Sequence, residues 1–199
     1  MQHADAVARL AADLVRLDSR SFVSNRAVAD RIAAELEGFA LERLDYADAA
    51  GVAKQVIVAH RGPPGGVALS GHMDTVPDTG WTDDPFSGRI DAEGVLHGLG
   101  AADMKGPLAA CIVAARTLPA HLPATLLITT DEETTKMGAR RIADHSALAR
   151  RRRHAASWWP SPRGCCRCAA TAATSTSSQW RRGCRRIPRS AWAATPTGR

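Results

Sequence analysis

The amino-acid sequence changes character at Arg150, and this boundary limits where a folded core can form. Residues 150–199 contain 12 of the chain's 26 basic residues and none of its 20 acidic residues. The same segment has a single Ile and no Leu, Val, Phe or Met, and its other apolar residues are Ala, Trp and Cys, so it lacks the aliphatic side chains that build an ordinary layered core. A hydrophobic core must therefore come from residues 1–149, and we predict a disordered basic tail over residues 150–199.

Residues 1–149 show helical and strand-like patterns in alternation. Predicted helices cover residues 7–17, 24–38, 106–118 and 134–145, the second with Ser24 as its N-cap. Predicted strands cover residues 40–46, 52–60, 67–70 and 124–130. This alternation indicates an α/β domain with a mainly parallel sheet flanked by helices.

Targeting signals are not apparent in the sequence. No stretch approaches the roughly 18 apolar residues of a membrane helix, and the first five residues do not begin a basic region followed by an apolar run. Cys111 is the single cysteine before Arg150, which favours a reducing compartment. We therefore expect a cytoplasmic protein without a membrane partner.

A first polar cluster, Ser70–Pro77, follows a predicted strand and contains His72 and Asp74. Alternate residues of an extended backbone point the same way, so these two side chains should project together. Asp74 could then accept the second imidazole N–H and orient His72 as a metal ligand. Taken alone, the pair could equally be a histidine and an aspartate in an ordinary turn.

A second cluster, Gly98–Gly106, leads into a predicted helix and carries Asp103 among small residues. Glycine and alanine allow the backbone to approach a ligand closely, and Asp103 would supply a carboxylate there. On this cluster alone, a helix N-cap is the simpler explanation of Asp103.

A third cluster, Asp131-Glu132-Glu133, follows an apolar predicted strand. Three adjacent acids repel one another unless a cation or a basic group offsets them. A divalent ion is one such partner, and the positive end of a helix is another. With a metal ion present, one carboxylate could bind it while its neighbour removes a proton.

In this order, the three clusters resemble the M20 family of metal-dependent amidohydrolases and peptidases, of the acetylornithine deacetylase and succinyl-diaminopimelate desuccinylase type. The similarity covers roughly residues 5–149. The motifs that carry it are Gly71-His72-Met73-Asp74-Thr75-Val76-Pro77, Trp81 with Asp84-Pro85-Phe86, Gly100 to Gly106, and Asp131-Glu132-Glu133.

The resemblance implies a role for five residues. His72 would be a ligand of one metal ion and Glu133 a ligand of the other, with Asp103 bridging the two ions. Asp74 would orient His72, Glu132 would be the general base, and the peptide bond after Asp103 would be cis. The implied cofactor is two zinc ions, with cobalt or manganese as alternatives. The implied reaction is hydrolysis of the amide bond of N-acyl amino acids or small peptides, often by a homodimer.

The resemblance also implies one further ligand for each metal ion: an acid in a Glu-Pro-Thr-like segment soon after residue 133, and a histidine nearer the C-terminus. No Asp or Glu follows Asp144. Tryptophan has one codon, and reading residues 158–164 one nucleotide earlier permits Val-Val-Ala-Glu-Pro-Thr-Gly, which is the expected segment. We interpret residues 150–199 as family sequence in a shifted frame, and the chain as a truncated, weakly active or inactive form. Sequencing of the coding DNA tests this interpretation, which fails if the frame is confirmed as given.

The tail also supports two other hypotheses. Its arginines are interspersed with tryptophans, and these side chains could bind nucleic acid through charge and stacking. The protein would then be a basic nucleic-acid-binding protein on a non-catalytic hydrolase domain. His154, Cys165, Cys168 and Cys184 could bind zinc. A shifted frame accounts for both compositions, so we expect no specific nucleic-acid partner.

Overall fold

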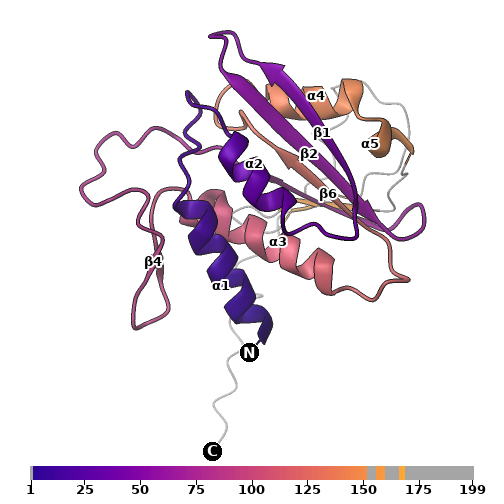
Figure 1. Cartoon of the computed structure of the whole chain (residues 1–199), viewed down its shortest axis with the longest axis horizontal. Coiled ribbons are helices and arrows are strands. Elements are labelled where there is room, and N and C mark those ends of the chain that lie inside the picture. Colours follow the sequence, from indigo (N-terminus) through magenta and orange to yellow (C-terminus); the bar gives the residue numbers. More distant parts are fainter. Residues whose placement is uncertain (1, 152–155, 160–165, 169–199) are drawn as a thin grey trace, which may run out of the picture.

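A computed structural model describes residues 2–151, 156–159 and 166–168, which form a twisted sheet with helices on both faces (Figure 1). The helices are α1 (Gln2–Val15), α2 (Arg26–Ala33), a short π-helix η1 (Ala101–Lys105), α3 (Gly106–Thr117), α4 (Met137–His145) and α5 (Ala147–Arg151). The strands are β1 (Ala40–Ala47), β2 (Ala53–Arg61), β3 (Val67–His72), β4 (Arg89–Ile90), β5 (Leu96–His97), β6 (Ala124–Thr129), β7 (Ala156–Trp159) and β8 (Cys166–Cys168). Within the described residues, none of the helices has the length and apolar composition needed to cross a bilayer.

The main sheet has the strand order β1-β2-β6-β3-β7-β8. The α/β class is confirmed, and the sheet is mixed: β3 lies parallel to β6 and β7, whereas the β1–β2, β2–β6 and β7–β8 pairs are antiparallel. In the parallel β3–β6 pair, His72 is in register with Thr129. The carboxyl ends of these two strands therefore lie together at one edge of the sheet, and each is followed by one of the polar clusters.

Strand β2 is buried on both faces because each face carries its own apolar core. Ile57 and Ala59 contribute to the larger core, with α1, α2 and α3. Val56 and Val58 point the other way and pack with Ile142 of α4 in a smaller core. This arrangement follows from the two-residue periodicity of a strand, and it explains why residues 52–60 form an almost continuous apolar run.

Two predicted helices are shorter than expected. The second ends at Ala33, and its N-cap position is Asn25 rather than Ser24. The Asn25 side chain does not cap the helix: its amide donates to the Gln55 carbonyl (2.7 Å) and its oxygen accepts the Gln55 N–H (2.9 Å). The last predicted helix begins at Met137, because Lys136 takes a left-handed conformation.

Strands β7 and β8 come from the arginine-rich segment and extend the sheet beyond β3. The sheet therefore reaches past the boundary that we placed after residue 149. The rest of the segment over which we predicted disorder lies outside the described residues, as do His154, Cys165 and Cys184 of the suggested zinc site.

Helix α4 lies unusually close to the end of β6. A Cβ atom added at the buried Gly138 would lie 2.3 Å from the carbonyl oxygen of Thr130 and 2.7 Å from its nitrogen. We expect Gly138→Ala to lower the free energy of unfolding by about 1–3 kcal/mol through overpacking, although alanine has the higher helix propensity. Urea denaturation measures the free energy of unfolding. Ala139→Gly, at the neighbouring exposed position, is the control for helix propensity and should cost about 1 kcal/mol. Stabilisation by Gly138→Ala would contradict the close approach.

Candidate metal centre

Three chain segments bring acids and a histidine together at the carboxyl edge of the parallel strands. His72 is the last residue of β3, Glu132 and Glu133 follow β6, and Asp103 lies in η1. The ligand atoms of His72, Glu132 and Glu133 all lie within 4.8 Å of one another. Nε2 of His72 lies 3.2 Å from Oδ1 of Asp103. All four candidate residues therefore meet in one cluster, with Asp74 directly beneath it.

Asp74 is fully buried and connects the two arms of this cluster. Its Oδ1 lies 3.4 Å from Nδ1 of His72, which also lies 3.0 Å from the Asp74 carbonyl oxygen. The carboxylate accepts the backbone N–H groups of Glu132 (3.2 Å) and Glu133 (3.1 Å). One carboxylate therefore fixes both the imidazole and the backbone that carries the two glutamates.

The electrostatics of the His72–Asp74 pair favour charge on both groups. Burial by itself would lower the pKa of His72, but the hydrogen bond to Asp74 and its negative charge outweigh burial and raise that pKa to about 9. Burial would likewise raise the pKa of Asp74, but His72 and the two backbone N–H groups hold it below its usual range. The pair thus keeps a carboxylate in place beneath the imidazole.

Glu133 shows the opposite effect. Burial raises the pKa of Glu133, and the neighbouring carboxylates Asp103, Glu132 and Asp74 raise it further, while His72 acts in the opposite direction. Crowded carboxylates of this kind are offset by a cation. Imidazole and carboxylate donors together suit zinc and similar divalent metals, so the donor set fits the metal that the sequence resemblance implies.

Glu132 has a cationic neighbour at its exposed side. Nζ of Lys136 lies 2.7 Å from Oε1 of Glu132 and donates to the Glu132 carbonyl oxygen at 2.6 Å. The Lys136 side chain is largely exposed, and such surface ion pairs contribute about 0–1 kcal/mol. The Glu132 carboxylate is therefore held only weakly by Lys136 and can be displaced from it.

Asp103 is the most accessible residue of the cluster, with 53% of its side chain exposed. The N-cap positions of η1 and α3 are Gly100 and Lys105, neither with a side-chain cap, so the simpler explanation of Asp103 as a helix cap is wrong. The Asp103-Met104 peptide bond is cis, as the resemblance implied.

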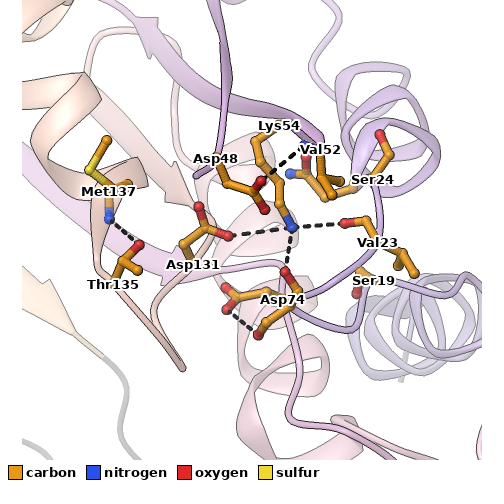
Figure 2. A network of polar contacts seen from close by, with 12 residues as sticks. Ser19, Val23, Ser24, Asp48, Val52, Lys54, Asp74, Asp131, Thr135 and Met137 are labelled. Atoms are coloured by element: carbon orange, nitrogen blue, oxygen red, sulfur yellow. Dashed lines mark hydrogen bonds and ion pairs between the residues drawn. The ribbon is translucent and has the colours of Figure 1, made fainter. Parts of the chain in front are cut away.

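Sequence reasoning missed the buried Lys54, which lies beside Asp131 (Figure 2). Tyr46 of the neighbouring strand also contacts Asp131. Lys54 lies inside an apolar strand, where nothing nearby in the sequence indicates a role. Asp131 was part of the acidic motif, but no function was assigned to it. Its left-handed backbone (φ 60°) turns the chain after β6.

Comparisons with known proteins lead to the family that the sequence motifs resemble. Residues 68–165 match the model of "Peptidase family M20/M25/M40". Acetylornithine deacetylase of Proteus mirabilis is 40% identical over 138 residues, 66% of this chain and 35% of that protein. Succinyl-diaminopimelate desuccinylase of Acidiphilium cryptum is 41% identical over 159 residues, 75% of this chain and 40% of that protein. The chain thus spans less than half the length of these curated relatives.

Solved structures show the same fold at lower identity. The dipeptidase Dug1p of Saccharomyces cerevisiae has a TM-score of 0.56 and 18% identity, over 76% of this chain and 38% of that chain. A Zn-dependent exopeptidase from Parabacteroides distasonis has a TM-score of 0.56 and 15% identity, over 78% of this chain and 60% of that chain. Family model, relatives and fold agree: over the matched segment, this chain is a member of peptidase family M20/M25/M40.

Proposed function

We propose that this chain carries the metal-binding part of a hydrolase that cleaves the amide bond of N-acyl amino acids or small peptides. The observation that carries the proposal is the meeting of His72, Glu132 and Glu133 within 4.8 Å, with Asp103 against His72. The names of the relatives, a deacetylase of acetylornithine and a desuccinylase of succinyl-diaminopimelate, support this substrate class.

Each residue of the cluster takes one task in this proposal. His72, Asp103 and Glu133 hold the metal, for which zinc is our candidate, and Asp74 orients His72. When bound, zinc supplies a Lewis acid that polarises the substrate carbonyl. Glu132 takes a proton from the attacking water and delivers it to the leaving amine. Its position at the accessible side of the cluster, paired with an exposed lysine, suits a group that must exchange protons.

We further propose that the metal site of this chain is short of ligands. Catalytic zinc normally keeps three protein ligands, and residues 145–199 contain no carboxylate. Strand β7 runs parallel to β3, from Ala156 opposite Val67 to Trp159. In the shifted frame, the acid of the Glu-Pro-Thr-like segment comes two residues after this strand, which is heading for the edge where His72 lies.

We expect the purified chain to bind fewer than two zinc ions and to hydrolyse N-acetylornithine negligibly, because each ion lacks one protein ligand. Elemental analysis after dialysis gives the metal content, and release of ornithine gives the turnover. The matched comparison is a protein translated from the same gene with its frame restored near codon 150, which should gain both properties. Two zinc ions per chain together with robust turnover by the chain as given would overturn the proposal of missing ligands. A frame-restored protein that binds zinc but cleaves no N-acyl amino acid or small peptide would overturn the proposed function.

A further inference from the structure

Figure 2 shows a buried lysine, Lys54, between Asp131 and the loop that carries Val23. The Lys54 side chain is completely buried. Its Nζ donates to the carbonyl oxygens of Ser21 (2.7 Å) and Val23 (2.8 Å) and lies 3.4 Å from Oδ1 of Asp131. One cation thus connects the loop before α2 with the segment that follows β6.

The first connection runs from Lys54 to Asp74. Lys54 binds the carbonyl oxygen of Ser21, and the Ser21 hydroxyl lies within donating distance of both the Thr75 carbonyl oxygen (3.0 Å) and Oδ2 of Asp74 (3.3 Å). The backbone N–H of Ser21 donates to the Thr75 carbonyl oxygen at 3.0 Å. Lys54 therefore fixes the loop that contacts Asp74 through Ser21, and Asp74 in turn contacts His72.

The second connection runs from Lys54 to the glutamates. Asp131 is buried, and its other carboxylate oxygen accepts the Tyr46 hydroxyl at 2.6 Å. Tyr46 and Lys54 are directly opposite each other in the β1–β2 pair, so one side chain from each of these two strands contacts the Asp131 carboxylate. The next two residues, Glu132 and Glu133, donate their N–H groups to Asp74.

These contacts form a closed ring from Lys54 through Asp131, the Glu132–Glu133 backbone, Asp74 and Ser21 back to Lys54. We propose that Lys54 is a positioning residue. Together with Tyr46 and Asp131, it holds the Glu132–Glu133 backbone against Asp74 and thereby sets the position of the two glutamates relative to His72. Burial of a lysine ion pair is costly and adds little net stability, whereas a ring of this kind fixes geometry. The consequence for metal affinity rests on the proposed function.

Lys54→Met removes the charge and keeps the length of the side chain. We expect it to weaken Co²⁺ binding by about tenfold or more, the usual range for partners behind metal ligands, and to speed amide exchange at Glu132 and Glu133 while the β2 and β6 amides stay protected. Tyr46→Phe should produce smaller changes of the same kind. Arg31→Met is the control: it removes a cation of α2 that makes two ion pairs, and it should change neither measurement. The intact chain is titrated with Co²⁺ by its absorption spectrum and mapped by hydrogen exchange.

Lys54→Met leaves Asp131 buried without its cation, so the Lys54→Met/Asp131→Asn pair serves if the single variant fails to fold. The pair should reproduce the loss of Co²⁺ affinity and the faster exchange. Wild-type affinity and unchanged exchange in a folded variant would overturn the positioning role. If the wild-type chain binds no Co²⁺, exchange at Glu132 and Glu133 still decides for or against the ring, and the proposed function is tested separately with the frame-restored protein.

Discussion

Replacing His72 with alanine is expected to abolish metal binding by this chain. Among the described residues, His72 supplies the one nitrogen donor of the candidate centre, and its ring is already held in place by Asp74. The glutamates that remain repel each other and offer only oxygen, which is a poor set for zinc. The loss should exceed the roughly 10–100-fold that follows removal of a partner behind a ligand, as measured by calorimetric titration with Zn²⁺.

The chain contains a matched control for this experiment. His60 is as buried as His72, with 2% of each residue exposed, and its ring is bonded to Thr125 (2.7 Å). It lies near the opposite edge of the sheet, because Thr125 pairs with Ala68 at the start of β3. His60→Ala removes an equally buried imidazole and should leave metal binding intact. Equal losses in both variants would mean that the effect comes from unfolding, and wild-type binding by His72→Ala would remove His72 from the site.

Asp74→Ala should be costly for both stability and metal binding. The change leaves the backbone N–H groups of Glu132 and Glu133 without their acceptor and removes the carboxylate beside the His72 ring. Each unsatisfied buried group costs about 1–3 kcal/mol, so the free energy of unfolding should fall by about 3 kcal/mol or more. Metal affinity should fall by about 10–100-fold, because the orientation of His72 is lost.

Urea denaturation and Zn²⁺ titration of the same samples separate the two effects. Asp74→Asn keeps the shape and one acceptor oxygen, so we expect it to recover part of the stability. Asp91→Asn is the control, since Asp91 also pairs with a histidine, His97 (2.6 Å), but at a position where 20% of the Asp91 side chain and 40% of the His97 side chain are exposed. A solvent-accessible pair of this kind contributes about 0–1 kcal/mol. If Asp74→Ala were no more costly than Asp91→Asn, Asp74 would not connect the two arms of the cluster.

The elements of this fold were predictable because its strands and helices carry clear periodicities. All eight predicted elements, including the buried strand at 52–60, are present and differ from the structure only at their ends. The sheet was expected to be mainly parallel because strands and helices alternate, but β2 runs antiparallel to β6. That pairing depends on which strands come together in three dimensions, and local sequence does not specify it.

The candidate site was predictable as three motifs, since each follows a strand or precedes a helix. Their joint position comes from the parallel pairing of β3 and β6. Lys54 could not be predicted in the same way. Tyr46 and Asp131 are separated by 85 residues, and a lysine within an apolar strand has no local pattern that distinguishes it from a solvent-facing residue at a strand edge.

The two apolar cores differ in size, and the metal centre lies where the layers that contain them meet. His72 extends from β3, which packs with the larger core, whereas Glu132 and Glu133 lead into α4, which is anchored by the smaller core around Ile142. Regions with fewer buried apolar contacts open first, so the layer that carries the glutamates should detach before the rest of the sheet. A ligand that binds only the closed state stabilises it by mass action. Metal bound by His72, Asp103 and Glu133 would therefore hold the two layers together, and its removal should make α4 the first part of residues 1–149 to be cut by a protease.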